Sequence, residues 1–298
     1  MKIASFGQGR IGIVEGEGVA DVSDIVGCDS AAWPPTAMLR FIASFSDLRP
    51  RIVERLRTAE RVPLAQSHLN CPVAWPNKLI AFPANYHAHI SEMKAGPGLI
   101  SKTDASGQGF FLKANSSLSG PNDSIVLPAI SNREVHHECE LAIVIGKGGR
   151  DIPRERAAEH IFGYSCLIDV VIRGKEERVM RKSFDTFCPM GPYITTADEV
   201  ARYDDIDLEL SVNGELRQKA NTRDLIVGVP EMIAMASSVM TLYPGDIIAS
   251  GTPAGVGPLK AGDHVTIRIA GVGEMGLDVK QGQGGAHPLW LKAAAASV

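Results

Sequence analysis

The sequence predicts an α+β fold in which strands predominate, and three observations lead to this class. Short apolar runs rich in β-branched residues recur along the chain, and residues 141–145, closed by Gly146, have the pattern of a buried strand. Residues 208–212 and 215–218 flank Asn213-Gly214, the favoured two-residue turn of a β-hairpin. Helical spacing is confined to a few segments, one of which begins at Pro230.

The chain has 298 residues, which is enough for one large domain or for a small domain beside a larger one. Its hydrophobic content of 45%, charged content of 21% and 30 glycines are typical of an enzyme-sized globular protein. The formal net charge of −4 comes without long runs of one sign. We therefore expect no nucleic-acid partner and no electrostatic attachment to a membrane.

The N-terminal segment and the cysteines bear on where the protein works. Residues 1–9 have no sustained apolar core, so we expect no signal peptide, and no apolar stretch is long enough to span a bilayer. The five cysteines are an odd number and are widely spaced, which favours buried reduced thiols over disulfides or a zinc site. These observations predict a cytoplasmic protein.

Residues 1–70 are predicted to form a small N-terminal α/β domain. It has three strand-like pieces broken by glycines, at residues 2–6, 10–14 and 18–22, and two segments with helical spacing, at 36–45 and 50–57. A proline-rich linker over residues 62–76 leads into a catalytic domain that we place at 71–280. Residues 281–298 are predicted to be a C-terminal tail.

Two acidic residues precede the buried strand at 141–145. If the strand extends back to His136, Glu138 and Glu140 lie on the same face, because side chains alternate with a period of two. Two carboxylates that enter an apolar strand repel each other and resist desolvation. A divalent cation would compensate both effects, and hard oxygen ligands favour magnesium, manganese or calcium over zinc. The alternative is a solvated strand edge at which both glutamates face water.

Asp169 is the single charge within a second apolar strand, at residues 161–171. As a third oxygen ligand it would complete one side of an octahedral cation and leave positions for water and substrate. The alternative is that Asp169 caps the segment at 173–180 or pairs with Arg173.

His89 and Glu92 stand three residues apart in a segment that can begin a helix. At this spacing the carboxylate can orient the imidazole, which would make His89 a general base, although an exposed polar helix face has the same pattern. The polar, glycine-rich stretch at residues 94–109 follows directly and could act as a lid.

Two further stretches offer groups for an anionic substrate. Lys182 is either a surface lysine or a cation that stabilises negative charge on an enolate. The glycine-rich loop at residues 251–257 matches neither a P-loop nor a dinucleotide fingerprint, so we predict no nucleotide. Its backbone amides and the Thr252 hydroxyl could hold a carboxylate instead.

Taken together, the segments between Lys78 and Lys280 resemble the fumarylacetoacetate hydrolase family. The motifs that carry the resemblance are, in order, Asn85-Tyr-x-x-His89-x-x-Glu92-Met93, Phe111-Leu-Lys113, Glu138-x-Glu140-Leu-Ala-Ile-Val-Ile-Gly-Lys147, Gly163-Tyr164, Asp169-x-x-x-Arg173, Lys182-Ser-Phe-Asp-Thr-Phe-Cys-Pro-x-Gly-Pro192 and Pro244-Gly-Asp-Ile-Ile-x-x-Gly-Thr-Pro-x-Gly-Val-Gly257.

The resemblance implies a catalytic domain built as a mixed-sheet β-roll behind a small N-terminal domain, and a homodimer. It also implies roles for nine residues of this sequence. The expected metal ligands are Glu138, Glu140 and Asp169, with magnesium as the metal and manganese or calcium as alternatives. The expected catalytic residues are His89, Glu92 and Lys182, with the helix that carries the first two closing over the site. The expected substrate-binding residues are Arg173, Thr252 and Tyr86.

The chemistry that the resemblance implies begins with a 2-oxo acid that has a second carbonyl two carbons away. The metal would chelate the 2-oxo group and the carboxylate, and His89, oriented by Glu92, would activate a water that attacks the distal carbonyl. Carbon–carbon cleavage would then leave a pyruvate enolate stabilised by the metal and Lys182. The leading hypothesis is a hydrolase of acylpyruvates such as fumarylpyruvate.

Three other functions share these residues. The first is an isomerase or decarboxylase of 2-hydroxymuconate-type intermediates in aromatic catabolism, and the second is a dehydratase or hydrolase of sugar acids. The third is a metal-binding protein without catalytic activity. The sequence departs from the family pattern at Gly174, where an aspartate is common, and at Glu176, where many members carry an amide. Both lie near the expected substrate.

Overall fold

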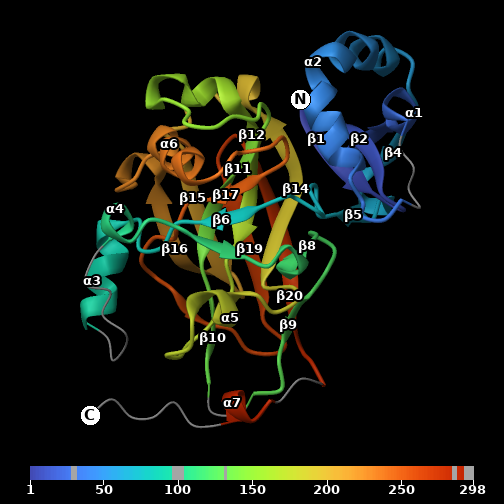
Figure 1. Ribbon diagram of the computed structural model, residues 1–298. Helices are drawn as coiled ribbons and strands as arrows, with labels where there is room; N and C mark the ends of the chain where they lie inside the picture. Colours follow the sequence, from blue (N-terminus) through green and yellow to red (C-terminus); the bar gives the residue numbers. More distant parts are fainter. Residues whose placement is uncertain (28–31, 96–103, 131–132, 284–286, 292–298) are drawn as a thin grey trace.

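A sheet of twelve strands runs through the N-terminal part and the predicted catalytic part of the chain (Figure 1). The computed structural model describes residues 1–27, 32–95, 104–130, 133–283 and 287–291. Ten strands of this sheet follow one hydrogen-bonded path: β4 (Arg61–Pro63), β3 (Gly18–Asp21), β2 (Arg10–Glu15), β1 (Lys2–Phe6), β14 (Cys188–Thr196), β12 (Ile161–Ile168), β11 (Cys139–Ile145), β17 (Ile247–Ala249), β6 (Leu79–Ala81) and β7 (Phe111–Lys113). Off this path, β5 (Leu69–Asn70) pairs with β1, and β8 (Leu118–Ser119) pairs with β14.

Two smaller sheets complete the β structure. One has five strands in the order β16 (Glu215–Asn221), β15 (Asp207–Val212), β19 (His264–Ile269), β20 (Gly273–Gln281) and β9 (Ile125–Leu127). The other has β13 (Val171–Ile172), β10 (Val135–His137) and β18 (Gly257–Pro258). The mostly β, α+β class that the sequence predicts is confirmed.

Helices are short, apart from one. The α-helices are α1 (Ser23–Val26), α2 (Ala37–Leu56), α3 (His87–Ala95), α4 (Ala105–Gln108), α5 (Arg178–Lys182), α6 (Val229–Val239) and α7 (Pro288–Leu291). The 3-10 helices are Leu64–Gln66, Asn115–Ser117, Arg154–His160, Ala197–Glu199 and Thr222–Asp224. Among the described residues, none of these helices is both long enough and apolar enough to cross a membrane.

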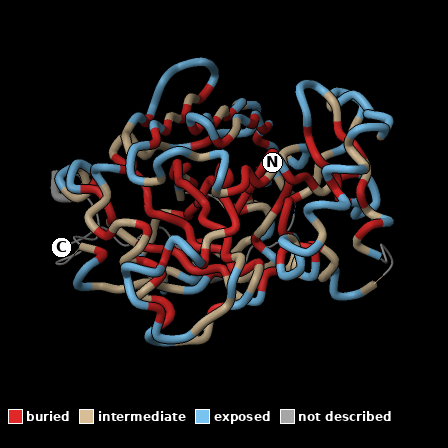
Figure 2. Tube along the Cα trace, turned by 90° about the horizontal axis from the view of Figure 1, so that it is seen from above, coloured by how far each residue is buried: buried red, intermediate tan, exposed pale blue. Residues whose placement is uncertain are grey.

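The main core lies between the large sheet and the five-stranded sheet. Buried apolar residues of β11 and β12, such as Leu141, Ile143 and Cys166, belong to one cluster with Leu208 and Leu210 of β15. Figure 2 shows buried parts of the chain gathered in the middle of the molecule, with exposed loops around them. The hairpin between β15 and β16 has the predicted turn, in which Asn213 (φ 52°) and Gly214 (φ 79°) are both left-handed.

The N-terminal part differs from its prediction in the helices and in the linker, since α1 is an added element and residues 62–76 contain part of β4, the 3-10 helix Leu64–Gln66 and β5. Helix α2 is continuous over the two segments at 36–45 and 50–57, although Pro50 cannot donate a backbone hydrogen bond. The Ser46 carbonyl therefore lacks its usual donor within the helix. Ser46 and Pro50 are both exposed, so water can donate to this carbonyl instead. The opposite face of α2 buries Phe41 and Ile52. Strand β1 continues the large sheet by pairing with β14, and the domain boundary at residue 70 stays a prediction.

The arrangement of β11 and β12 positions the acidic residues. These two strands pair through Cys139 and Ile168, and both leave the large sheet directly beyond that pair. Their continuations, β10 and β13, pair with each other in the three-stranded sheet. Glu138 and Asp169 stand at the change of sheet, joined by a hydrogen bond of 2.9 Å from the Asp169 backbone N–H to the Glu138 carbonyl. The predicted continuous strands at 136–145 and 161–171 therefore each have a break at an acidic residue.

Gly163 in β12 tests how closely these strands are packed. A Cβ atom at this position would lie 2.3 Å from the Thr195 carbonyl oxygen and 2.8 Å from a methyl group of Ile194. We predict that Gly163→Ala lowers the free energy of unfolding by about 1–3 kcal/mol, because it overpacks the centre of the large sheet. Urea unfolding measures the change. The control is Gly228→Ala, where no atom lies within 4 Å of the added carbon; an equal loss in both variants would contradict the packing argument.

Candidate metal centre and active site

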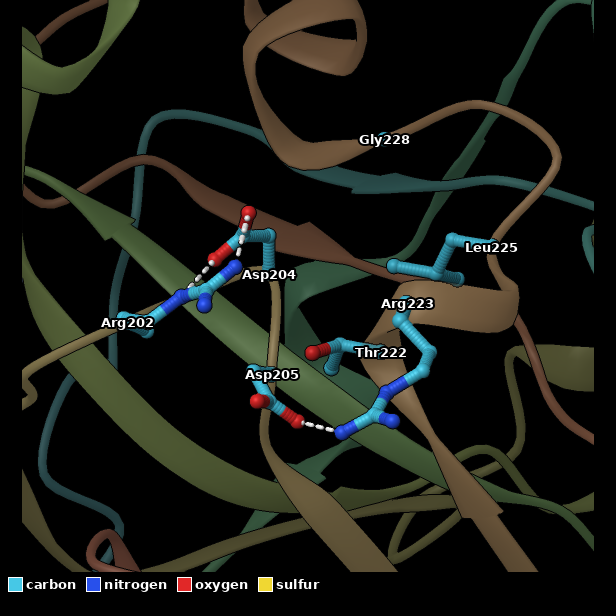
Figure 3. Close-up of a pocket in the computed structure, with 7 residues that line it drawn as sticks. All are labelled: Arg202, Asp204, Asp205, Thr222, Arg223, Leu225 and Gly228. Atoms are coloured by element: carbon cyan, nitrogen blue, oxygen red, sulfur yellow. Dashed lines mark hydrogen bonds and ion pairs between the residues drawn. The ribbon is translucent and has the colours of Figure 1, made fainter.

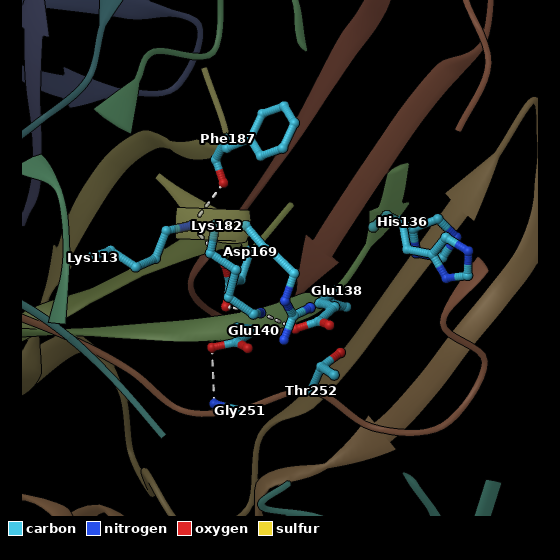
Figure 4. Close-up of polar contacts among 12 residues, drawn as sticks. Lys113, His136, Glu138, Glu140, Asp169, Lys182, Phe187, Gly251 and Thr252 are labelled. Atoms are coloured by element: carbon cyan, nitrogen blue, oxygen red, sulfur yellow. Dashed lines mark hydrogen bonds and ion pairs between the residues drawn. The ribbon is translucent and has the colours of Figure 1, made fainter. Parts of the chain in front are cut away.

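Three buried carboxylates converge where β11 and β12 change sheets (Figure 4). Glu138, Glu140 and Asp169 are 7%, 2% and 1% exposed, and each offers an oxygen within 4.8 Å of the oxygens of the other two. Glu138 and Glu140 are two residues apart and face the same side, while Asp169 comes from the neighbouring strand. The alternative in which the glutamates face water is therefore wrong. Oxygen donors crowded in this way could hold a hard divalent cation.

Two buried lysines neutralise part of this negative charge. Lys182 Nζ, on α5, lies 2.6 Å from Glu138 Oε2 and also donates to Asp169 Oδ2. Lys113 Nζ, at the end of β7, lies 2.5 Å from Asp169 Oδ1 and donates to the Phe187 carbonyl oxygen at 2.8 Å. Asp169 thus pairs with two lysines and not with Arg173, the partner that sequence reasoning considered. Lys182 is 6% exposed, so it is not a surface lysine.

The pKa values of the two glutamates separate because their neighbours differ. Burial alone raises the pKa of Glu138, but the charges of Lys182 and Arg173 outweigh it and lower this pKa to about 2. Burial and the charge of Asp169 raise the pKa of Glu140 well above its usual range, with only a partial offset from Lys182. Ionised Glu140 therefore needs more positive charge than its neighbours supply. This need fits a divalent cation among Glu138, Glu140 and Asp169.

His89 and Glu92 form the predicted pair on α3. Glu92 Oε2 lies 3.0 Å from His89 Nδ1, and Glu92 Oε1 accepts a hydrogen bond of 2.9 Å from the Gly255 backbone N–H. Because a carboxylate accepts, Nδ1 carries the proton and Nε2 is left as the basic nitrogen. His89 is 4% exposed, which rules out a purely exposed polar face. Of the proposed lid at 94–109, residues 96–103 lie outside the described residues, and 105–108 form α4.

A buried glutamine joins the metal centre to the glycine-rich loop. Gln218 Oε1 accepts from the Cys139 backbone N–H at 2.9 Å and from His137 Nδ1 at 3.0 Å. Its Nε2 donates to Thr252 Oγ1 at 2.8 Å and to the Pro253 carbonyl oxygen at 2.9 Å. Since the Thr252 oxygen accepts from Gln218, its own proton remains available to donate to a ligand.

The same loop also contacts the metal centre directly. The Gly251 backbone N–H donates to Glu140 Oε2 at 2.9 Å, and Figure 4 shows Thr252 beside these carboxylates. Gly251 has φ 88°, and a Cβ atom there would lie 2.7 Å from the Phe82 carbonyl oxygen. Both observations require glycine at this position. The loop can therefore approach the acidic cluster with its backbone.

Tyr86 and Arg173 also lie close to the cluster. The Tyr86 hydroxyl is buried and has no hydrogen-bond partner among the described residues. Burial, and then the nearby Cys139 and Glu140, raise the pKa of Tyr86, so the hydroxyl stays protonated and can donate. The charge of Arg173 acts on both Glu138 and Glu92 and lowers the pKa of each, although burial opposes it. Arg173 therefore lies near Glu138 and near the His89–Glu92 pair.

A surface pocket of about 450 Å³ lies away from this chemistry (Figure 3). Its charged side chains neutralise one another, because Arg202 pairs with Asp204 and Arg223 pairs with Asp205. None of the nine residues expected to act on a substrate lines it. The acidic cluster, and not this pocket, is the candidate active site.

Comparison with known proteins identifies the family. A sequence model of the fumarylacetoacetate hydrolase C-terminal region matches residues 78–280. The chain belongs to the fumarylacetoacetate hydrolase family. Among its relatives, the maleylpyruvate hydrolase of Aquipseudomonas alcaligenes is 42% identical over 286 residues, which cover 94% of this chain and 99% of the relative.

Two solved structures of family members resemble the whole chain. The maleylpyruvate hydrolase of Sphingobium sp. SYK-6, solved in complex with manganese(II) and pyruvate, is 53% identical with a TM-score of 0.87 and covers 95% of this chain and 100% of its own. A probable 2-hydroxyhepta-2,4-diene-1,7-dioate isomerase of Mycobacterium abscessus is 30% identical with a TM-score of 0.78, covering 95% and 99%.

Sequence reasoning missed three polar residues of the site. These are Lys113, which belongs to a family motif but has no predicted role, and Gln218 and His136, which have no predicted role either. Lys113 and Gln218 are far along the chain from the groups they contact, as His136 is from Arg173, and a lone lysine, glutamine or histidine in a strand gives no local signal. Glu176, where the sequence departs from the family pattern, pairs with Arg133. Each of its carboxylate oxygens lies 2.8 Å from a terminal nitrogen of that arginine.

We predict that Glu138→Gln weakens manganese binding by more than the roughly 10–100-fold that follows from loss of an outer-shell partner. The amide keeps the shape of the side chain but removes one of three charges that face the cation. Isothermal titration calorimetry with Mn²⁺ measures the affinity. The matched control is Glu155→Gln on an exposed 3-10 helix; unchanged affinity in Glu138→Gln would rule out Glu138 as a ligand.

Proposed function

We propose that the protein is a divalent-metal-dependent hydrolase that cleaves a carbon–carbon bond of a 2,4-dioxo acid, an acylpyruvate such as maleylpyruvate or fumarylpyruvate. The observation that carries the proposal is a buried trio of carboxylates close to a histidine whose second ring nitrogen is free to accept a proton. The names of two whole-chain relatives and the manganese and pyruvate bound by one of them support it.

The cation would be held by Glu138, Glu140 and Asp169, and we propose magnesium, with manganese as a substitute. When bound, it would supply Lewis-acid polarisation of the 2-oxo group and carboxylate of the substrate. Lys113 donates to Oδ1 of Asp169 and so orients this side chain. The Gly251 N–H does the same for Glu140.

His89 acts as the general base of the proposed reaction. Glu92 holds Nδ1–H, so Nε2 can take a proton from a water that attacks the distal carbonyl carbon. Glu92 is itself fixed by the Gly255 N–H. The same nitrogen can return the proton to the carbon released when the bond breaks.

The remaining charged and polar groups stabilise the substrate. Lys182 lies against Glu138 and Asp169, where its ammonium can stabilise negative charge on a substrate oxygen that would bind at the cation site. Thr252 can donate its hydroxyl proton to the substrate carboxylate. Arg173 and Tyr86 are proposed to bind further substrate oxygens. We also propose that the protein is a homodimer, and its cytoplasmic location stays a prediction from the sequence.

A second candidate is an isomerase of 2-hydroxymuconate-type dienoates. A solved structure named as a probable 2-hydroxyhepta-2,4-diene-1,7-dioate isomerase shares the fold over 95% of this chain at 30% identity. Hydrolysis and isomerisation differ in whether water attacks the substrate, so both can use the same metal ligands and lysine. A role limited to metal binding is disfavoured, because cation binding alone requires neither a buried His89 nor its carboxylate partner.

Substrate conversion separates these functions. We expect the protein with Mg²⁺ or Mn²⁺ to convert maleylpyruvate, fumarylpyruvate or simple acylpyruvates to pyruvate and an acid, as followed by loss of enol absorbance and product identification. A chelator should abolish the reaction. An absorbance shift without chain cleavage would favour the isomerase, release of carbon dioxide would favour a decarboxylase, and no conversion would turn attention to sugar acids.

We predict that His89→Ala reduces kcat by about 10²–10⁴-fold, the range that general base catalysis contributes. Manganese affinity should stay nearly unchanged, since His89 is not a proposed ligand. The matched control is His87→Ala, two residues earlier on the same helix, because His87 is exposed. Steady-state kinetics and calorimetry give the two readouts, and simultaneous loss of turnover and metal affinity in His89→Ala would contradict its role as a base.

A further inference from the structure

A chain of three polar side chains runs from the surface to Arg173. Arg173 Nε donates to His136 Nδ1 at 3.0 Å, and His136 Nε2 lies 2.9 Å from Glu134 Oε2. The backbone reinforces this arrangement, because the Arg173 N–H donates to the Glu134 carbonyl oxygen at 2.9 Å and His136 pairs with Val171 between β10 and β13. These contacts are separate from the contacts of the three carboxylates that are proposed to bind the metal.

The contacts determine which nitrogen of His136 carries the proton. A guanidinium has donors only, so His136 Nδ1 must present a lone pair to Arg173. A carboxylate only accepts, so His136 Nε2 must carry the hydrogen that it donates to Glu134. Glu134 thus selects the one neutral tautomer of His136 that can accept from Arg173. The Glu134 side chain is 67% exposed, whereas the His136 side chain is 12% exposed.

Because Arg173 donates to His136 through Nε, its two terminal nitrogens are left for other partners. Among the described residues, no protein group accepts a hydrogen bond from the two terminal nitrogens of Arg173. Those nitrogens form a fork that can bind two oxygens of a ligand side by side. An arginine already held at Nε also loses less side-chain freedom when the ligand binds.

We propose that His136 is a positioning residue for Arg173: by accepting from Nε, it holds the guanidinium so that its two terminal nitrogens bind oxygens of the substrate. This inference rests on the substrate-binding role proposed for Arg173. Glu134 acts one step further out, by fixing the tautomer of His136. His136 itself contacts neither the substrate nor the metal ligands' carboxylates in this scheme.

The test compares two substitutions of His136 that differ in hydrogen bonding. His136→Asn keeps an acceptor close to the position of Nδ1, whereas His136→Leu has a similar size and no acceptor. A hydrogen bond to a charged group contributes about 1.5–3 kcal/mol, which corresponds to roughly a 10–100-fold change. We expect His136→Leu to lower kcat/KM with an acylpyruvate by about this factor, and His136→Asn to restore most of it.

A double-mutant cycle with Arg173→Met shows whether the effect passes through Arg173. If it does, adding His136→Leu to Arg173→Met should change kcat/KM less than about twofold, because the coupled group is already absent. Manganese affinity by calorimetry and the unfolding midpoint should stay unchanged in His136→Leu. These two readouts exclude a general disturbance of the metal centre or the fold.

Several outcomes would overturn the inference. It is wrong if Asn and Leu cause equal losses, if the loss from His136→Leu persists in full in the Arg173→Met background, or if His136→Leu is as active as the wild type while Arg173→Met is not. Failure of the proposed function has a different signature: full activity in Arg173→Met would remove the substrate-binding role of Arg173 itself.

Discussion

The charge imbalance among three buried carboxylates is the constraint on which the rest of the site depends. Glu138, Glu140 and Asp169 lie together in the interior, where nearby cations lower the pKa of Glu138, while burial and the neighbouring carboxylates keep the pKa of Glu140 raised. An uncompensated buried charge costs several kcal/mol, so the surrounding structure has to supply donors or a cation. The Gly251 N–H supplies one donor, and a divalent cation would supply the missing charge.

The change of sheet at Glu138 and Asp169 explains how the fold accommodates the negative charge of the buried carboxylates. A continuous pair of strands would bury these side chains against apolar neighbours. Because β11 and β12 leave the large sheet at this point and continue as β10 and β13, the acidic side chains meet α5 and the glycine-rich loop instead. The apolar core between the sheets remains uninterrupted, and it holds both strands in register. Glu138 and Asp169 thus stand just beyond the stretches of β11 and β12 that form the core, while Glu140 lies within β11 itself.

Family members named as hydrolases and as isomerases share this whole-chain fold. The chemical difference between them must therefore arise from groups around the carboxylates and not from the fold. In this chain those groups are connected: Glu92 is tied to the Gly255 N–H, Thr252 to Gln218, and Gln218 to the Cys139 N–H between two of the acids. The His89–Glu92 pair, Thr252 and the carboxylates are consequently connected through the glycine-rich loop and Gln218.

The sequence by itself determined the features that depend on local spacing. Alternation in strands indicated that Glu138 and Glu140 share a face, a three-residue helical spacing paired His89 with Glu92, and Asn213-Gly214 specified the hairpin turn. Only the tertiary structure decided that Lys113 and Lys182 share Asp169, that Gln218 joins two segments, and that His136 holds Arg173. The physical reason is that these contacts depend on strand register and on the change of sheet. Both are set by packing of the whole core, which no short stretch of sequence specifies.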